Sequence, residues 1–414
     1  MEKNSQNRTI LIIVLFIIIL ALANSTQYMI SPNLILISNY FGYGSNLTPL
    51  GFLTFSFIGV SGISMLFFGY LADKFTRKWI VFAGVSLFSL SSSLIILVPA
   101  GRVGYQIFFL LTLIIGVSFG IIIPSIFSLI GDFISRKNRS KGLSFFSISS
   151  LFGMVIGLTL ATFIGEFDWR ISYLIVGIFM TLNALLVLRI SEPSRMGKDY
   201  VELTENNTIE YSYRIKREDI KYVFKKKSNV WLVVNFVDTI PTGIILFLLF
   251  AYMEVYHNVH SIVALTILLL ALISTLLGTI FFGFVGDKKY NQGNKKARVK
   301  LALLGNIIPI PFVFIALIIP FQVSNNSNLL ELLVEPGLIL MIFLFSIGLF
   351  INGAVNGNWY ATVVDINLPE HRGTVLASSN FFDIFGRAIG PLIAAIISDL
   401  YGILYGMTIS IVFW

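Results

Sequence analysis

Three charged side chains stand inside long apolar stretches of this sequence. Asp238 lies roughly 12 Å into the stretch 229–255 by helical rise, while Asp383 and Arg387 lie one helical turn apart within 374–397. A charge at membrane depth usually faces a cavity or a partner. A buried acid there can take up and release a proton, because burial disfavours its charged form. An arginine can bind a carboxylate or another anion.

The surroundings of Asp238 favour a proton-carrying role. Thr239, Pro241, Thr242 and Gly243 follow it directly. Proline and glycine can interrupt a helix and expose backbone groups to a cavity, as in many transporter sites. We therefore predict that Asp238 is a proton carrier. The alternative is a structural carboxylate that is hydrogen-bonded between helices.

Asp383 and Arg387 share one helix face at i, i+4 spacing, so they can form an ion pair that neutralises both charges. A second hypothesis is that Arg387 also reaches Asp238. A proton or a substrate anion would then compete for the guanidinium.

Neutral polar side chains within the apolar stretches are candidates for lining a substrate cavity. They are Asn24, Gln27 and Tyr28 in the first stretch, Asn235 in the seventh, and Asn352 and Asn356 in the tenth. The last two share a helix face. The fourth stretch offers little beyond Ser118 and Ser125. A cavity that is more polar on its C-terminal half suits an amphiphile better than a sugar.

Composition places these residues in a membrane. Of 414 residues, 56% are hydrophobic and only 12% are charged, with a mean hydropathy of +0.86. So few charges could not cover a soluble protein of this length. A membrane-spanning helix needs ~20 apolar residues. The sequence predicts about twelve such helices, at 9–38, 49–72, 79–99, 105–132, 143–165, 171–190, 229–255, 261–286, 298–321, 336–364, 374–397 and 400–414. We expect the first and tenth to tilt or extend past the membrane, and the last to be truncated.

The basic residues predict the orientation. Of 29 Lys and Arg, Arg102 and Arg170 fall in alternate short loops and Arg387 falls inside a helix. The others lie at the N-terminus, in loops after the even-numbered helices, or at helix edges. This positive-inside pattern predicts a multi-pass protein of the cell (cytoplasmic) membrane with both termini in the cytoplasm. A nucleic-acid partner is not expected, despite a net charge of +8.

Other chemistries find little support. There is no cysteine, and His257, His260 and His371 all fall in predicted loops, so no metal site is expected. No phosphate-binding loop or serine nucleophile motif occurs. We expect neither an enzyme nor a cofactor. A channel would need a ring of like side chains, which a duplicated asymmetric hairpin does not supply. A receptor that kept the fold but lost transport stays open as an alternative.

A hairpin motif occurs twice and divides the chain into related halves. The first copy carries Gly69, Asp73, Lys74 and Arg77, and the weaker second copy carries Gly283 and Asp287. We predict that they act as gating latches. Further gate pairs are expected between Asp132 and Arg136 or Arg139, and between Asp365 and Arg372. The expected domains are 1–190 and 229–414, joined by a cytoplasmic linker at 191–228.

These residues resemble the major facilitator superfamily. Gly69-x-x-x-Asp73-Lys74-x-x-x-Lys78 matches its signature loop, and Trp169-Arg170 is similar to its common start of helix six. The resemblance implies an all-α membrane protein with twelve transmembrane helices in two pseudo-symmetric six-helix bundles. It also implies alternating access and contact between helices seven and eleven.

A narrower resemblance concerns the tenth and eleventh helices. Asn358-Trp359, Asp365, Arg372-Gly373 and Asp383 are similar to the Spinster-like branch, which carries lysolipids and other amphiphiles. The acid of that branch on helix one is replaced here by Asn24–Tyr28, and its helix-four motif reads Gly116-Val-Ser-Phe-Gly120. We therefore expect a secondary active transporter for a small amphiphilic or lipid-like substrate, with protons as a possible coupling ion. The alternatives are a proton-coupled multidrug exporter and a facilitator of small organic anions. Each chain has a complete two-bundle design, so we expect a monomer.

Overall fold

A computed structural model describes residues 2–133, 139–190, 221, 223–322, 335–367 and 369–414. Over this part of the chain, every regular element is a helix. Ten of the helical segments are long and apolar enough to cross a membrane, and two shorter apolar helices, Ser149–Phe163 and Ile403–Phe413, accompany them. The all-helical membrane architecture predicted from composition is therefore confirmed.

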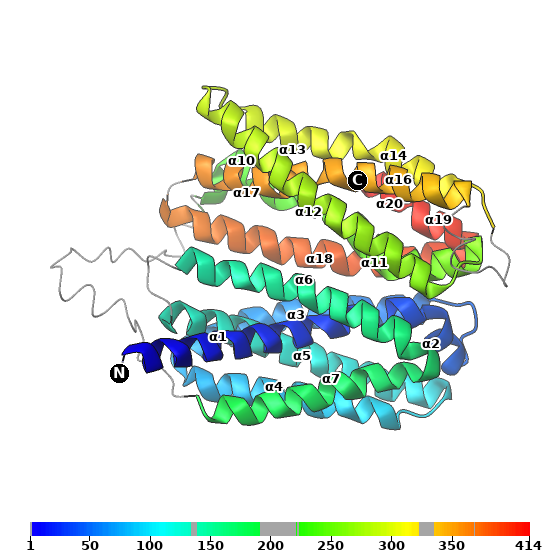
Figure 1. The fold of residues 1–414 in the computed structure, drawn as a ribbon, viewed down its shortest axis with the longest axis horizontal. Coiled ribbons are helices and arrows are strands. Elements are labelled where there is room, and N and C mark those ends of the chain that lie inside the picture. The colour runs from blue at the N-terminus through cyan, green and yellow to red at the C-terminus, as the bar shows by residue number, and fades with distance from the viewer. Residues whose placement is uncertain (1, 134–138, 191–220, 222, 323–334, 368) are drawn as a thin grey trace. The chain divides into compact units, whose positions relative to one another are not determined.

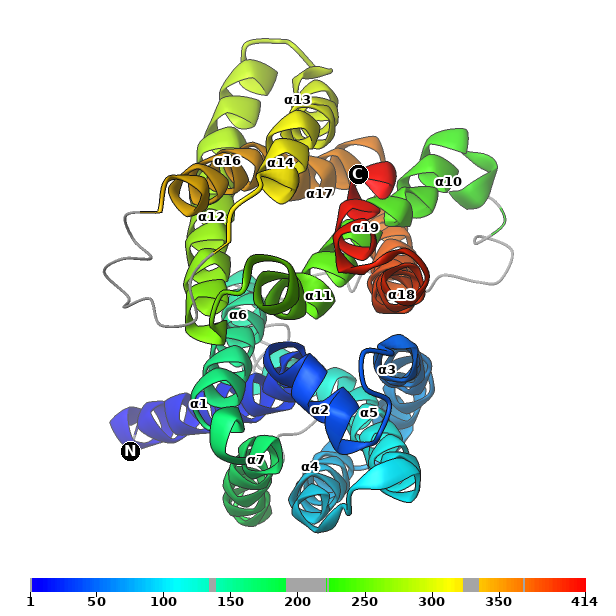
Figure 2. The same cartoon turned by 90° about the vertical axis from the view of Figure 1, so that its right-hand side faces the viewer.

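Contacts divide the chain into two compact units, Met1–Tyr211 and Ser212–Trp414. The division falls within the predicted linker 191–228, most of which lies outside the described residues. In unit 1 the helices run along a common direction (Figure 1), and α4 and α7 of this unit are seen nearly end-on in Figure 2. They are α1 (Glu2–Ser25), α2 (Leu34–Tyr40), α3 (Thr48–Lys74), α4 (Arg77–Leu94), α5 (Gly101–Phe133), α6 (Arg139–Phe163) and α7 (Gly165–Leu188).

Unit 2 contains several spans that are interrupted along their length. Its helices are α10 (Lys227–Val234), η5 (Asn235–Thr239), α11 (Ile240–His257), α12 (Ser261–Asn291), α13 (Ala297–Ile307), α14 (Pro309–Ile318), α16 (Pro336–Asn352), α17 (Ala354–Ile366), α18 (Pro369–Tyr401), α19 (Ile403–Thr408) and α20 (Ser410–Phe413). Pro241, Pro309 and Pro336 each lie in the first turn of a helix, where a missing N–H costs nothing. Gly402 has a positive φ of 100°, which lets the chain turn from α18 into α19.

The same helix pairs pack in both units. In unit 1 the first span (α1) packs on the fifth (α6), and the second (α3) packs on the fourth (α5). In unit 2 the corresponding pairs are α11 with α18, and α12 with α16 and α17. The duplicated hairpin motif thus reflects two units with the same internal packing.

The two longest predicted spans are interrupted rather than simply tilted. The first changes after Ser25 into two short 3-10 turns, Thr26–Tyr28 and Ser31–Asn33, before α2 begins. Pro32 lies in the second turn and cannot donate a helical hydrogen bond. The tenth is divided at Gly353, where a Cβ would lie 2.6 Å from the Thr275 carbonyl oxygen. These breaks leave backbone groups without intrahelical partners inside the spans.

Small residues set the closest helix contacts in unit 1. A Cβ at Gly153 of α6 would lie 2.4 Å from the Ala21 carbonyl oxygen, and one at Gly157 would lie 2.1 Å from that of Ser25. The backbones of α1 and α6 are therefore in direct contact, as small residues at four-residue spacing allow.

Large apolar side chains of both units, such as Leu66, Trp231 and Phe284, are exposed. An outer surface of this kind fits hydrocarbon and not water.

The end of unit 1 far from its hairpin motif is fastened by Arg170. Its guanidinium forms an ion pair with Asp168 at 2.6 Å and donates hydrogen bonds to the Tyr40 hydroxyl (2.9 Å) and the Val98 carbonyl oxygen (3.0 Å). Trp169 beside it is buried and packs edge-on against the ring of Phe108. A permanent charge thus joins the ends of three spans.

Candidate functional site

Asp238 lies where the seventh span changes its helical form. α10 ends at Val234, residues Asn235–Thr239 form a 3-10 turn, and α11 begins at Ile240. The interruption expected from Pro241 and Gly243 is confirmed. The Asp238 side chain is partly buried, and the side chain of Asn235 lies outside the described residues.

Glycines bring this turn against α18. A Cβ at Gly386 would lie 2.2 Å from Thr239 Oγ1, and one at Gly390 would lie 2.6 Å from the Ile240 carbonyl oxygen. The Thr239 hydroxyl is 3.0 Å from the backbone carbonyl oxygen of Asp383 and 2.7 Å from that of Phe236. The turn that carries Asp238 therefore packs on the turn of α18 that carries Asp383.

The charged pair of α18 has a third polar neighbour. Asp383 is partly buried and Arg387 is exposed. Their charges interact with each other and with the Tyr360 side chain of α17. No direct ion pair joins Arg387 to Asp383 or to Asp238 among the described side chains. The Tyr360 hydroxyl donates a 3.0 Å hydrogen bond to Asn380 Oδ1.

Tyr360 and Asn380 were missed by the sequence analysis. Neither residue type is unusual in a membrane helix, and only the packing of α17 on α18 brings them together. The one available signal was that Asn380 precedes Asp383 and Arg387 on the same helix at spacings of three and seven residues. Such spacings place all three on one face.

Asn352 connects two helices of unit 2. Its amide nitrogen donates to the Gly305 carbonyl oxygen at 3.3 Å, which links the end of α16 to α13. The side chain of Asn356 lies outside the described residues. Asn358 was named in the narrower resemblance but not among the candidates for lining a cavity. It is buried and donates to the carbonyl oxygens of Ala354 (2.9 Å) and Phe282 (3.2 Å).

In unit 1 the predicted polar residues lie at the break of the first span. The Asn24 amide donates to the Leu20 carbonyl oxygen at 2.7 Å. Its Oδ1 accepts from Ser150 of α6 at 3.3 Å and from Gln27 at 3.5 Å. Tyr28 is partly buried at the end of the 3-10 turn. The structure therefore brings Asn24 and Gln27 together.

A small cavity adjoins this break. It is lined by Thr26, Gln27, Ile30, Thr54, Phe57, Thr112, Ile115 and Tyr173, and its volume of about 10 Å³ is enough for one water molecule. The buried Thr112 hydroxyl has no partner among the described protein atoms. A water molecule there would satisfy this hydroxyl. A cavity that holds one water molecule is too small for a substrate of drug size.

The first hairpin motif is fastened through Arg77. This side chain begins α4 and is only 3% exposed. Its guanidinium donates to Ser128 of α5, to Oγ at 3.1 Å and to the carbonyl oxygen at 3.4 Å. The side chains of Asp73, Lys74, Asp132 and Arg139 lie outside the described residues. The predicted pairs that involve them stay predictions.

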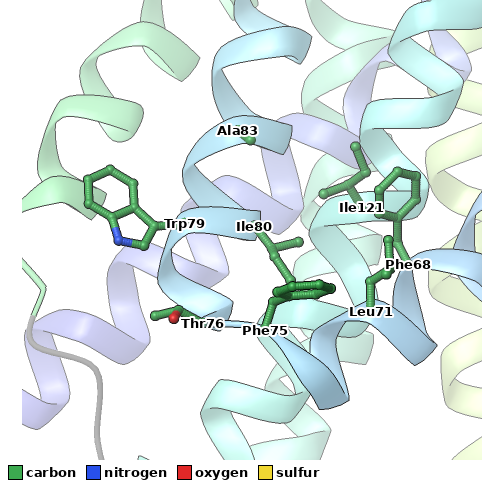
Figure 3. A pocket seen from close by; sticks show the side chains of 8 residues that line it. All are labelled: Phe68, Leu71, Phe75, Thr76, Trp79, Ile80, Ala83 and Ile121. Atoms are coloured by element: carbon green, nitrogen blue, oxygen red, sulfur yellow. The ribbon is translucent and has the colours of Figure 1, made fainter.

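An apolar groove lies beside this motif. Figure 3 shows side chains of α3, α4, α5 and the link between α3 and α4 around a space of about 410 Å³, lined by Phe68, Leu71, Phe75, Thr76, Trp79, Ile80, Ala83 and Ile121. Only Thr76 brings a hydroxyl to it. The groove therefore offers no site for a proton or for an anion, and it belongs to the apolar support of the hairpin.

The second hairpin motif is fastened by a residue that was not predicted. Arg298 of α13 forms an ion pair with Asp287 at 2.6 Å and another with Asp365 of α17. Its guanidinium also lies over the Tyr290 ring, 4.2 Å from the centroid. The expected partner of Asp365 was Arg372, whose side chain lies outside the described residues. Arg298 occupies Asp365 because α13 packs directly on α17.

The motif glycines are not required by close contacts. A Cβ at Gly69 would lie 3.7 Å from Pro124, an ordinary contact, and one at Gly283 would meet open space. Gly286, which was not predicted, is the crowded position. A Cβ there would lie 2.0 Å from Asn358 Oδ1.

Comparison with known proteins places this architecture. The model described as Major Facilitator Superfamily matches residues 14–391. Over 196 residues the chain is 28% identical to Multidrug resistance protein 1 of Bacillus subtilis (strain 168), covering 47% of this chain and 48% of that protein. Over 241 residues it is 29% identical to Protein spinster homolog 3 of Danio rerio, covering 55% and 44%. The chain thus spans about half the length of these two curated relatives.

Solved structures show the same fold. A crystal structure of a bacterial homologue of the human lysosomal transporter Spinster, in an inward-facing and unoccupied conformation, matches with a TM-score of 0.75. The match covers 98% of this chain and 94% of that chain at 16% sequence identity. At this identity the likeness concerns the fold.

Proposed function

Because the chain belongs to the major facilitator superfamily, we propose that this multi-pass secondary transporter couples protons, through Asp238, to the movement of a small amphiphilic or lipid-like substrate. The family assignment makes it a transporter of small molecules and not an enzyme. The proton, the substrate class and the residue roles are the proposal.

One observation carries the proposal. Asp238 lies on a 3-10 turn inside a span, and this turn is hydrogen-bonded through Thr239 to the backbone of Asp383. A change in the charge of Asp238 acts directly at the contact between the seventh and eleventh spans. Binding and release of a proton at Asp238 can therefore change the packing of these two spans.

The exposed Arg387 supplies a site for the polar end of a substrate. It makes no direct ion pair with the described carboxylates of its own cluster, so its guanidinium is available to a phosphate or carboxylate. Tyr360 and Asn380 add neutral hydrogen-bonding groups beside it. This polar cluster, within spans that are otherwise apolar, fits a substrate with one polar end and one apolar end.

A proton-coupled multidrug exporter is the second candidate. It is favoured by the 28% identity to Multidrug resistance protein 1 over 196 residues. The lipid-like substrate is favoured by the likeness to a spinster homologue. The two candidates differ in the charge of the substrate, because a cationic drug would be repelled by Arg387 and a lysophospholipid phosphate would be attracted.

The test is a proton-flux measurement with the purified protein in liposomes that contain a pH-sensitive dye. Lysophospholipids, lipophilic cationic drugs and small organic acids are added in turn. We expect a proton signal with lysophospholipids that is lost in Asp238→Asn. Asp399→Asn is the matched control, because Asp399 is an exposed carboxylate near the far end of α18. This variant should keep the signal.

Each other outcome decides between the alternatives. A proton signal with cationic drugs only would favour the multidrug exporter. Substrate flux without a proton signal would remove the coupling role of Asp238. If thermal unfolding shows that the protein is folded and no flux is measured, a receptor that kept the fold is favoured.

We also propose that both termini lie in the cytoplasm. The basic residues in the loops that follow the even-numbered spans support this orientation. Labelling of single introduced cysteines with a membrane-impermeant reagent tests it, since the chain has no cysteine of its own. Labelling of either terminus from outside intact cells would contradict it.

A further inference from the structure

His257 is buried at the end of a helix and does not lie in a loop as the sequence analysis predicted. It is the last residue of α11 and is fully buried. Its ring stacks on Phe321 with centroids 3.9 Å apart and meets Tyr252 and Tyr256 edge-on at 5.0 and 4.9 Å. In a ring that is buried in this way, the hydrogen-bond partners decide which of the two nitrogens carries a proton.

Both ring nitrogens have partners. Nδ1 lies 2.9 Å from the Phe321 carbonyl oxygen, and Nε2 lies 2.8 Å from the Tyr252 hydroxyl. The same hydroxyl lies 2.5 Å from the carbonyl oxygen of Leu317, in the last turn of α14. Four polar groups thus form one continuous chain from the end of α11 to the end of α14.

Counting the protons in this chain limits its states to two. A carbonyl oxygen can only accept, so Nδ1 carries a hydrogen. The Tyr252 hydroxyl has a single hydrogen, and it has two neighbours that can accept it. If it donates to Leu317, then Nε2 must donate to Tyr252, and the ring is a cation with both nitrogens protonated. If Nε2 is bare, the hydroxyl turns to it and the Leu317 carbonyl loses this donor.

Burial of the ring disfavours its charged form, and the helix ends around it act in the opposite direction. His257 lies in the last turn of α11, and Leu317 lies in the last turn of α14. The final carbonyls of a helix lack intrahelical donors, and the negative end of the helix dipole stabilises a nearby cation. Two helix C-termini therefore meet at one imidazole.

We propose that His257 is a proton-binding site whose charge state decides whether α11 is tied to the end of α14. With the proton bound, the chain runs from His257 through Tyr252 to Leu317. Without it, Tyr252 donates to His257 and the tie to α14 is broken. This site lies at the opposite end of the same span from Asp238, and the inference does not rest on the proposed function.

The other titratable groups near this end are few. On α11, Tyr256 contacts the ring and Glu254 is exposed. The described parts of α14 and of 319–322 carry no titratable side chain. His260 caps α12 with Nδ1 3.4 Å from the Ile262 nitrogen, and the ends of α18 and α19 bring Asp399 and Tyr405, both exposed. Glu335 precedes α16 and is partly buried. In the part of the chain that the structure describes, the two ring nitrogens contact Phe321 and Tyr252 and none of these carboxylates.

Histidine NMR in lipid nanodiscs tests the proton site. His260→Asn with His371→Gln leaves His257 as the sole histidine of the chain, so ¹⁵N-histidine signals belong to it alone. We expect the form protonated at Nδ1 only at alkaline pH, and both nitrogens protonated at acid pH, within a range of about pH 4 to 9 around the ordinary histidine value of about 6.5. An Nε2-protonated neutral form, or one unchanging spectrum, would overturn the proposal. If the double variant does not fold, the difference between the natural protein and His257→Gln gives the same assignment.

Hydrogen exchange tests the tie to α14. After correction for intrinsic rates, the amides around the end of α14 should be better protected when His257 is charged. Tyr252→Phe should abolish this pH dependence. Tyr256→Phe is the matched control, because Tyr256 makes ring contacts with Tyr252 and His257 but has no described hydrogen bond to either. Loss of the dependence in both variants, or in neither, would contradict the tie.

Discussion

The two hairpin motifs occupy equivalent places in the two units, yet they are fastened differently. Arg77 begins α4, is 3% exposed and donates to Ser128 of α5. Arg298 lies in the first turn of α13, with a side chain that is 15% exposed, and forms ion pairs with Asp287 and Asp365. The arginine of unit 1 is buried, whereas the charged cluster of unit 2 is partly exposed.

In both units the arginine lies at the start of the helix that follows the motif, although its distance in sequence from the motif aspartate differs. In the first motif Arg77 follows Asp73 by four residues, across the short link between α3 and α4. In the second, a longer turn that includes Gly293 separates Asp287 from Arg298. The basic half of the second motif is present, but it begins on the next helix. The motif therefore describes a contact at the start of the third helix of each unit.

Removal of the two arginines should give the largest difference. We expect Arg77→Ala to lower the free energy of unfolding by roughly 3 kcal/mol, because it leaves a buried space and unpaired groups. Arg298→Ala should cost about 1–2 kcal/mol, since its partners are partly solvated. Thermal unfolding in detergent measures both. Only the Arg298→Ala effect should shrink in high salt. A larger loss for Arg298→Ala would reverse the comparison.

The glycines of the second motif should separate next. Gly286→Ala places a Cβ against Asn358 and should destabilise the protein by about 1–3 kcal/mol. Gly283→Ala meets open space and should be neutral, or stabilising by up to about 1 kcal/mol through helix propensity. Thermal unfolding again distinguishes them, with Gly69→Ala as the unit 1 counterpart. If Gly283→Ala keeps its stability but loses transport, the glycine serves a different conformation of the hairpin.

The two carboxylates around Arg298 should show the smallest difference. The Asp365 side chain is 27% exposed and that of Asp287 is 62% exposed. Asp365→Asn should therefore cost about 1 kcal/mol and Asp287→Asn less than about 0.5 kcal/mol. A double-mutant cycle with Arg298→Ala measures each pair separately. Equal coupling energies would show that exposure does not decide their strength.

The opposite ends of the units differ in the same sense. Unit 1 is closed there by Arg170, whose charge is permanent, and unit 2 by His257, whose charge can change. At this end, unit 1 therefore carries a permanent charge, whereas unit 2 carries a titratable group. The two groups for which we propose proton binding, Asp238 and His257, both lie on the seventh span.

The sequence by itself determined the helical membrane architecture, the duplicated hairpin and the helix break at Asp238. These features depend on local properties, namely the apolar length of a segment, the missing N–H of proline and the spacing of side chains along one helix. Only the tertiary structure decided the partner of Asp365, the burial of His257 and the bond from Thr239 to Asp383. Each of these joins residues that are far apart in the chain, and which helices meet is decided by tertiary packing and not by the local sequence.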